Sequence, residues 1–435
     1  MKIRLYAPQT LIIPRAIPHS MSATHILLKN ANQVLTLTGD NSVPRTGEGM
    51  RDLGIIQNGD VWISHGRISA VGADDGATHD AELIIDCTGK VVMPGFIDPH
   101  THPVFAGSRE NELGMKLKGH SYMEIQQAGG GIFSSVRKTR EATNDVLIAQ
   151  AMKRLDTMLL HGTTTVEAKS GYGLNTETEL RMLEVMKTLG EQHPMGIVST
   201  FMGAHAIPTE FHGKREEFLN SMIGLLPTIA ERKLAEFCDV FCETGAFTLA
   251  EAETMLAAAK ANGLGLKIHA DEIENIGGSS LAAKMMAVSA EHLVKTSEMD
   301  MRHMAESGVI GVLLPGTPYS LMMKEYANAR KMIELDMPLA LATDLNPNCW
   351  TESMQLIISM ACYQMKMMPS EAIVASTINA AHAVNRHRKV GSIEVGKQAD
   401  VIILDVPNYE HIPYHFGVNL VDTVIKAGEI AVGGP

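Results

Sequence analysis

Two histidines separated by one residue, His100 and His102, are the first residues along the chain whose types and spacing could hold a metal ion. They follow the apolar segment 91–97. In an extended segment alternate side chains point to the same face, so both imidazoles can reach one cation. A third histidine and a carboxylate from elsewhere would complete a mononuclear site with a position open for water. That is the layout of a catalytic rather than a structural metal site.

Residues that could supply the rest of such a site recur at the ends of later apolar segments. Asp344 follows the almost uncharged segment 339–343. A carboxylate at the end of a buried strand needs a partner, and a metal ion is a suitable one. Glu272 could move protons near a metal-activated water, the alternative being a solvated loop carboxylate. His292 could be catalytic or, as a lone histidine, a satisfied core residue. The whole set is Tyr172, His205, His269, Glu272, His292, Asp344 and Asn346.

Arg109 and Tyr172 could bind a small anionic substrate. An arginine can hold a carboxylate through two parallel hydrogen bonds, although a surface salt bridge is the alternative. Tyr172 lies between two glycines in "KSGYGL", which allow the backbone to approach a ligand. Lys169, in the same segment, raises a different possibility, a carboxylated lysine that bridges two metals. We expect Lys169 to pack or to form ion pairs instead, because the ligand set is complete without it.

The segment 94–388 contains the elements that must position these residues. Short apolar segments alternate eight times with helix-like segments, which predicts a (β/α)8 TIM barrel of the α/β class. A doubly wound sheet is the alternative, and the count of eight favours the barrel. One helix is predicted to begin with Asn144 as its N-cap and to end before Gly162. Barrel enzymes build their sites at the carboxyl ends of the strands, where the candidate residues fall.

The sequence at both ends of the chain predicts short strands joined by glycine-containing turns. We expect 21–93 and 389–435 to form one discontinuous, β-sandwich-like domain, and 1–20 to be an N-terminal extension. The glycine-rich stretch 126–140 lacks a phosphate-binding loop motif, and we expect a flexible loop next to the active site.

Composition excludes several function classes. With 37 Lys and Arg against 49 Asp and Glu, the net charge is −12 and no basic run indicates nucleic-acid binding. No apolar run approaches the roughly 18 residues of a membrane span. The five cysteines lack a pairing pattern, which is typical of free thiols in a reducing cytoplasm.

Two frames carry a resemblance to a known family. "VVMPGFIDPHTH" at 91–102 and "GSIEVGKQADVIILD" at 391–405 resemble the metal-dependent amidohydrolase superfamily. Within it, segments such as "HPVFAGSREN", "KSGYGL", "GAHAIP", "ATDLNPN" and "IPYHFGVN" resemble the imidazolonepropionase family. These segments extend over residues 90–420, nearly the whole chain, and as a set they are very specific.

The resemblance implies a hydrolase that opens the cyclic amide of 4-imidazolone-5-propanoate to N-formimidoyl-L-glutamate, in the degradation of histidine. It implies a homodimer with one Zn²⁺ or Fe³⁺ per subunit. The implied metal ligands are His100, His102, His269 and Asp344, and the implied substrate contacts are Arg109, Tyr172, His205, Glu272 and Asn346. His292 matches the catalytic histidine of the family. Glu272 or Asp344 would move the proton of the attacking water, and the sequence does not decide between them.

The chain departs from the family at one turn. Asn348 and Cys349 stand where the family has Gly followed by Ser or Thr. A backbone contact to the substrate could survive Asn, which tolerates left-handed conformations, whereas a hydroxyl contact would weaken with Cys. Two other functions are compatible with the residues: a nucleobase or related aminohydrolase (deaminase) of the same superfamily, and a non-catalytic binding scaffold. Arg109 and "KSGYGL" favour a substrate with a carboxylate over a neutral base.

Overall fold

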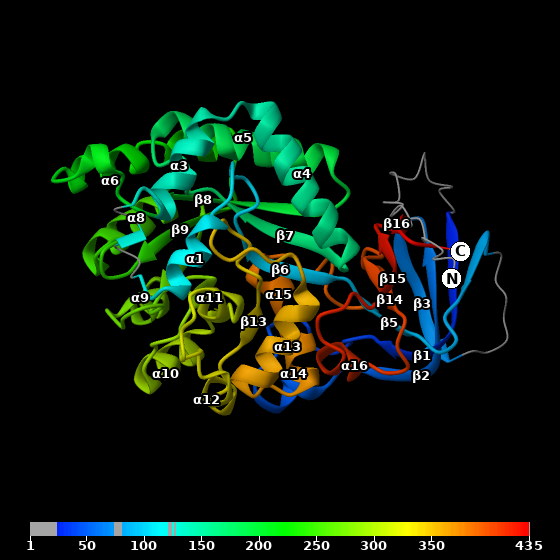
Figure 1. Cartoon of the computed structure of the whole chain (residues 1–435). Helices are drawn as coiled ribbons and strands as arrows, with labels where there is room; N and C mark the ends of the chain where they lie inside the picture. Colours follow the sequence, from blue (N-terminus) through cyan, green and yellow to red (C-terminus); the bar gives the residue numbers. More distant parts are fainter. Residues whose placement is uncertain (1–23, 74–80, 121–123, 126–127, 435) are drawn as a thin grey trace, which may run out of the picture.

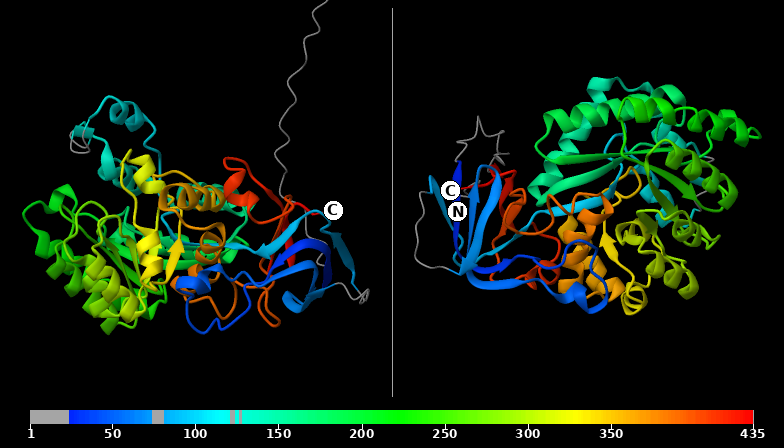
Figure 2. Two further views of the ribbon diagram at one scale, coloured as in Figure 1. Left: turned by 90° about the horizontal axis from the view of Figure 1, so that it is seen from below. Right: turned by 180° about the vertical axis from the view of Figure 1, so that it is seen from behind.

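The computed structural model describes residues 24–73, 81–120, 124–125 and 128–434 of the 435-residue chain. The predicted extension at 1–20 lies outside the described residues. Two sheets of eight strands organise the molecule, and they lie side by side in all three views (Figures 1 and 2). One sheet is curved into a barrel surrounded by helices, and the other is formed by both ends of the chain.

The barrel has eight parallel strands in sequence order. A parallel bridge between Thr101 and Leu345 brings its last strand back to its first, and the His102 amide donates to the Leu345 carbonyl at 2.8 Å. The predicted (β/α)8 barrel is therefore confirmed. Its strands are β6 (Phe96–Thr101), β7 (Thr163–Lys169), β8 (Gly196–Ala204), β9 (Phe237–Cys242), β10 (Gly265–Ala270), β11 (Ser289–His292), β12 (Ile310–Leu313) and β13 (Leu339–Leu341).

Helices follow each barrel strand and cover the outside of the sheet (Figure 1). After β6 to β9 come α1 (Asn111–Leu117), α3 (Gly131–Glu141), α4 (Asn144–Leu160), α5 (Thr176–Gln192), the 3₁₀ turn η2 (Thr209–Phe211), α6 (Arg215–Ile223), α7 (Leu226–Glu231) and α8 (Leu249–Ala261). After β10 to β13 come α9 (Gly278–Met285), α10 (Glu298–Ser307), α11 (Gly316–Ser320), α12 (Ala329–Glu334), α13 (Met354–Met365), α14 (Pro369–Ala375) and α15 (Ile378–Ala383). No helix of the described ranges is long and apolar enough to cross a membrane.

Two local predictions were wrong. The N-cap of α4 is Thr143 rather than Asn144, because Thr143 is extended and its side chain accepts a hydrogen bond from the Val146 amide. Gly162, with φ of +90°, does follow the helix end as predicted. Most of the stretch 126–140 is not a loop, since α3 begins at Gly131. The Glu112 carboxylate accepts the Gly131 amide at 2.7 Å and so caps this helix.

The second sheet joins residues from both ends of the chain, as the sequence predicts. Its strands are β1 (His25–Leu35), β2 (Ile55–Ser64), β3 (Arg67–Ala73), β4 (Leu83–Asp86), β5 (Val91–Pro94), β14 (Val401–Leu404), β15 (Val421–Lys426) and β16 (Glu429–Val432). β14 pairs with β5 and β15, which ties the two ends together. The 3₁₀ turn η1 (Gly47–Arg51) and α16 (His411–Tyr414) lie outside these strands. The domain limits 21–93, 94–388 and 389–435 stay predictions.

Candidate metal centre and active site

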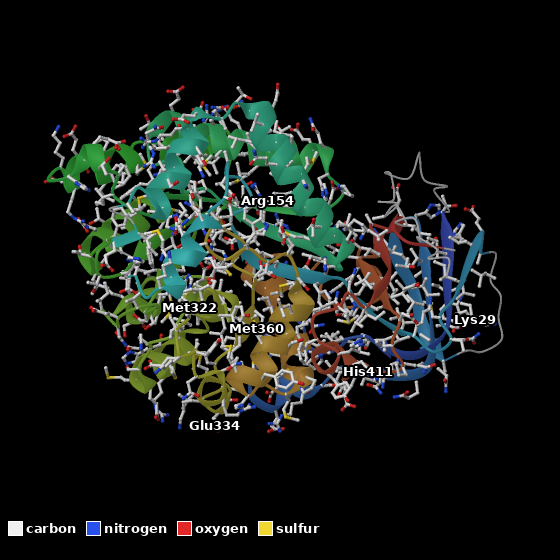
Figure 3. All side chains as sticks on the ribbon, in the orientation of Figure 1. Lys29, Arg154, Met322, Glu334, Met360 and His411 are labelled. Atoms are coloured by element: carbon white, nitrogen blue, oxygen red, sulfur yellow. The ribbon has the colours of Figure 1, made fainter. Side chains whose placement is uncertain are left out.

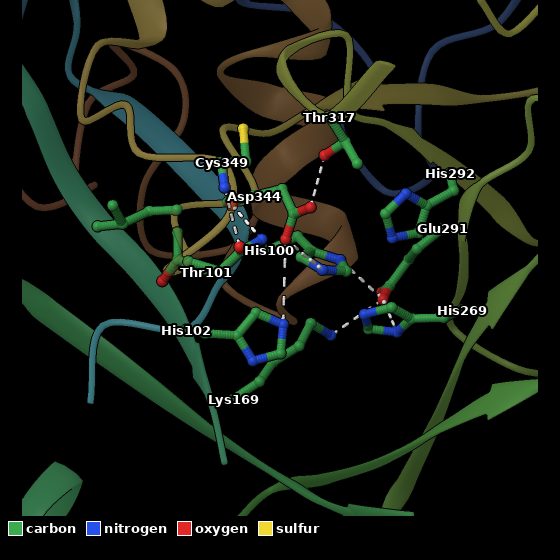
Figure 4. A network of polar contacts seen from close by, with 12 residues as sticks. His100, Thr101, His102, Lys169, His269, Glu291, His292, Thr317, Asp344 and Cys349 are labelled. Atoms are coloured by element: carbon green, nitrogen blue, oxygen red, sulfur yellow. Dashed lines mark hydrogen bonds and ion pairs between the residues drawn. The ribbon is translucent and has the colours of Figure 1, made fainter. Parts of the chain in front are cut away.

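Four candidate ligands converge at the carboxyl ends of the barrel strands (Figure 4). His100 and His102 lie on and just after β6, His269 on β10 and Asp344 just after β13, and all four are buried. The ring nitrogens of the three histidines lie within 4.8 Å of one another. The carboxylate of Asp344 approaches two of them, with Oδ1 at 3.4 Å from His100 Nε2 and 4.0 Å from His102 Nε2.

Neighbouring groups orient the side chains of His102 and Asp344 so that one donor atom of each stays free for a cation. His102 Nδ1 lies 3.2 Å from the Ser170 carbonyl oxygen, which can only accept, so Nδ1 carries the proton and Nε2 keeps a free lone pair. The Thr317 hydroxyl donates to Asp344 Oδ2 at 2.5 Å and leaves Oδ1 facing the histidines. Asp344 has φ of +53°, a conformation that costs energy in a residue other than glycine and persists only where its surroundings impose it.

The donor set fits a transition metal. Three imidazoles and one carboxylate are ligands that Zn²⁺ and iron accept. Burial, with the neighbouring histidines, holds the pKa of His102 and of His269 well below the usual value, so both rings are neutral and able to coordinate. Burial and Lys169 oppose a charge on His100, but Glu291 and Asp344 raise its pKa to about 9. The site therefore favours a positive charge between its carboxylates.

Glu272 and His292 lie together beside the candidate ligands. The Glu272 Oε2 to His292 Nε2 distance is 3.8 Å. Burial, followed by the charges of Asp344 and Glu243, raises the pKa of Glu272 to about 8. Burial lowers the pKa of His292 to about 4, so its ring is neutral at pH 7. A carboxyl group and a neutral imidazole next to a metal site can move protons and stabilise charge.

An aromatic group adjoins the ligands. The rings of His102 and His205 stack with centroids 5.2 Å apart, and Tyr172 meets both edge-on at 5.5 and 5.3 Å. His205 Nδ1 lies 3.0 Å from the Gly171 carbonyl, so Nε2 is the nitrogen that can accept a hydrogen bond from a ligand. Burial lowers the pKa of His205 to about 4, which keeps this ring neutral. The structure thus brings Tyr172 and His205 next to the candidate ligand His102, and their contacts with substrate stay predictions.

Arg109 is not a surface residue, since only 8% of it is exposed. Its Nε and NH2 atoms donate to the two oxygens of Glu112 at 2.9 and 2.7 Å, so Glu112 fixes the guanidinium. Lys116, one turn further along α1, donates to the Asn348 side chain at 2.7 Å. Sequence reasoning missed both Glu112 and Lys116, although their spacing from Arg109 and from one another, three and four residues, is that of neighbours on a helix.

The turn after β13 is organised by Asn346. Its Oδ1 accepts the amides of Asn348 and Cys349 at 2.7 and 3.0 Å, and its Nδ2 donates to the Asp344 carbonyl at 2.8 Å. The Cys349 thiol is buried and points at the Thr343 carbonyl. These side chains shape the turn that carries Asp344. Their contacts with substrate stay predictions.

Apart from Lys169, sequence reasoning also missed a layer of charged residues on the amino-terminal side of the candidate ligands. It consists of Glu167, Lys169, Asp239, Lys267 and Glu291, whose side chains are completely buried. The available signal was a charged residue inside an otherwise apolar strand, as in "FCDVF" and "GLKIHA". The expectation that Lys169 forms ion pairs is confirmed, because it contacts Glu167, Asp239 and Glu291.

The class of protein follows from this fold and site together with comparison with known proteins. Residues 91–431 match the amidohydrolase family, and the chain belongs to it. Solved structures with the same fold include a zinc-bound adenosine deaminase from Xanthomonas campestris (17% identity, TM-score 0.68, 94% of this chain and 93% of that one). Another is a zinc complex of atrazine chlorohydrolase from Arthrobacter aurescens TC1 (14% identity, TM-score 0.69, 94% and 95%).

Relatives of similar sequence identify the particular family within the amidohydrolases. The chain is 51% identical to the imidazolonepropionase of Geobacillus sp. (strain WCH70) over 416 residues, which are 94% of this chain and 98% of the relative. It is 52% identical to that of Geobacillus kaustophilus (strain HTA426), again over 416 residues and with the same coverage. The chain therefore belongs to the imidazolonepropionase family, whose members are hydrolases that act on C–N bonds. The alternative function, a deaminase, is supported only by the similarity of fold to the adenosine deaminase structure.

Proposed function

We propose that the chain hydrolyses the cyclic amide of 4-imidazolone-5-propanoate to N-formimidoyl-L-glutamate, in the degradation of histidine to glutamate. The observation that carries this proposal is the convergence of three imidazoles and one carboxylate in a chain half identical to imidazolonepropionases.

The metal cofactor is proposed as one Zn²⁺ or Fe³⁺ per subunit, held by His100, His102, His269 and Asp344. Such a cation, when bound, lowers the pKa of water and polarises a carbonyl oxygen. Asp344 is the less suitable proton carrier, since Thr317 occupies one of its oxygens and the other faces His100 and His102.

Glu272 is the better candidate for the proton transfer. Its carboxyl group faces His292 rather than a ligand histidine. A cation held by the neighbouring ligands would favour the ionised form of Glu272 and so oppose the effect of burial on its pKa. We propose that the Glu272 carboxylate takes the proton of the attacking water and returns it to the ring nitrogen as the amide C–N bond breaks. His292, neutral and next to Asp344, would donate to the oxygen on which negative charge develops.

Arg109 and Tyr172 would orient the propionate of the substrate, and His205 Nε2 would accept a hydrogen bond from the ring. Glu272, Asn346, Asn348 and Cys349 complete the proposed substrate site. Lys116 is a further cation close to the turn at Asn348.

We also propose a cytoplasmic homodimer. The location is supported by five free cysteines, four of them buried. The dimer rests on the sequence resemblance alone, and light scattering of the purified protein tests it.

The test of function is a spectrophotometric assay. Freshly prepared 4-imidazolone-5-propanoate should lose its ultraviolet absorbance on addition of the protein, stop doing so after chelation, and resume after metal is restored. His102→Ala should lose metal and activity together, whereas His303→Ala, which alters an exposed histidine of α10, should keep both. Full activity of metal-free protein, or ammonia release from nucleobases without turnover of the imidazolone, would refute the assignment.

A further inference from the structure

The buried charged layer has an arrangement that the proposed reaction does not use. Lys169 Nζ lies 3.0 Å from Glu167 Oε1, 2.6 Å from Asp239 Oδ2 and 3.0 Å from Glu291 Oε2. All four side chains are completely buried, and Figure 4 shows the Lys169 side chain pointing toward Glu291 and His269. The ammonium donates hydrogen bonds to Glu167 and Asp239 and forms an ion pair with Glu291, so its charge faces three carboxylates.

The same oxygens form a group that could hold a cation. Donor atoms of Asp239, His269 and Glu291 lie within 4.8 Å of one another. Asp239 Oδ2 and Glu291 Oε2 lie 3.0 and 3.4 Å from His269 Nδ1, and these are the oxygens that Lys169 contacts. The ammonium group therefore occupies the place where a metal ion would meet these two carboxylates.

The charge of the layer supports this interpretation. Three carboxylates and two ammonium groups, from Lys169 and Lys267, leave one negative charge, which faces His100 through Glu291 Oε2 at 2.9 Å. Without Lys169 the layer would carry two uncompensated negative charges away from water, an arrangement that destabilises the folded chain. A divalent cation in place of the ammonium would neutralise these two charges.

We propose that Lys169 is a built-in cation that occupies a second metal position of the barrel and thereby limits the site to one metal ion. The proposal rests on the proposed metal site of His100, His102, His269 and Asp344. It disfavours a carboxylated Lys169, because a carbamate is an anion and could not lie among three carboxylates. Lys169 is thus a positioning residue that sets the metal count, and it need not touch the substrate.

The test is metal stoichiometry. Wild-type protein and Lys169→Met are stripped, titrated with Mn²⁺ or Zn²⁺, dialysed and measured by elemental analysis. We expect one equivalent per chain for the wild type and two for Lys169→Met, whose melting temperature should rise further with the second equivalent. Lys169→Met/Glu291→Gln should return to one, because a carboxylate of the second position is gone.

Lys267→Met is the matched control. Lys267 is as deeply buried and contacts Glu167 and Glu291, at 3.2 and 3.6 Å, but within the described part of the chain it forms no ion pair with Asp239. We expect this variant to keep one equivalent. If Lys267→Met bound a second equivalent of metal, the specific role of Lys169 would be overturned.

The remaining outcomes separate the inference from the proposed function. A wild-type chain that binds no metal refutes the proposed metal site. A wild-type chain that binds two ions refutes the role of Lys169, and so does a Lys169→Met chain that binds one. If folded Lys169→Met is recovered only from medium supplemented with metal, the inference is supported. If the variant is insoluble with and without added metal, the inference is overturned, because a cation then fails to replace the ammonium.

Discussion

Arg154 on α4 should control the loop that follows His100 and His102, the first two proposed metal ligands. The side chain is labelled in Figure 3, and only 4% of the residue is exposed. Its NH1 atom donates to the carbonyls of Pro103 and Phe105 at 2.8 and 3.0 Å, directly after His102. Its guanidinium carbon lies 3.5 Å from the centre of the Phe105 ring and 5.0 Å from that of Trp350.

The structure gives a magnitude for Arg154→Met. A hydrogen bond to a charged group contributes about 1.5–3 kcal/mol, and a desolvated cation–π contact about 2 kcal/mol. These contributions are not additive, and methionine keeps part of the packing. Burial lowers the pKa of Arg154 to about 10, so part of the gain offsets the cost of a buried charge. A net loss of about 3 kcal/mol in local stability corresponds to roughly 100-fold more frequent opening of the loop.

Amide hydrogen exchange measures that opening. The Ala106 amide donates to the Thr139 hydroxyl at 3.1 Å, so a peptide covering 103–107 reports on the loop. We expect it to exchange about 100-fold faster in Arg154→Met, with weaker retention of metal, while β14 keeps its protection. Arg232→Met, which breaks the exposed ion pair with Glu184, is the control and should change little. Unchanged exchange at 103–107 in Arg154→Met would refute the reasoning.

Three further substitutions test separate parts of the molecule. Arg109→Ala should raise KM strongly while the metal content stays at one equivalent, and loss of metal would contradict its role as a substrate clamp. Glu272→Gln should lower kcat by about 10²- to 10⁴-fold with the metal retained, and a kcat near that of the wild type would exclude it as the proton carrier. Glu371→Gln should destabilise the protein by about 2 kcal/mol at pH 7, as seen in its melting temperature. Burial raises the pKa of Glu371, but hydrogen bonds from Arg330, the Met368 amide and Arg51 outweigh burial and hold it below the usual value. Because the pKa is lowered on folding, this stabilisation is present above about pH 4.5 and is lost as the pH falls through the folded value, so the difference from wild type should shrink below pH 4. A constant difference from pH 3.5 to 7.5 would contradict it.

The sequence predicted the barrel and the candidate ligands for one physical reason. In a parallel barrel all carboxyl ends of the strands meet on one face, so a histidine or carboxylate at the end of an apolar segment must lie on that face. His100, His269 and Asp344 could therefore be grouped without knowledge of their distances. Family resemblance then supplied the particular substrate, which spacing alone does not define.

Other features could not be predicted because they depend on contacts between distant segments. The partner of Arg109, Glu112, also caps α3, and this contact turns a glycine-rich stretch into a helix start. Asn346 was predicted as a substrate contact, yet its side chain bonds its own turn. Thr317 could not be connected with Asp344 from a separation of 27 residues.

The spacing of charged residues along the strands connects the proposed metal site with the charged layer beneath it. Residues two apart on a strand face the same side, and Lys267 precedes His269 by two on β10. A layer of apolar side chains at this depth, the usual filling of such a barrel, would leave His100 Nδ1 and His269 Nδ1 buried with no charged group beside them. Glu291 and Asp239 instead place carboxylate oxygens 2.9 and 3.0 Å from these two nitrogens, on the side away from the proposed metal position. Carboxylates at that depth need cations in turn, which is why buried lysines lie inside the barrel of a chain whose net charge is −12. The candidate ligand histidines therefore place carboxylates beneath them, and these carboxylates need buried cations. The ammonium of Lys169 is the cation that contacts three of them.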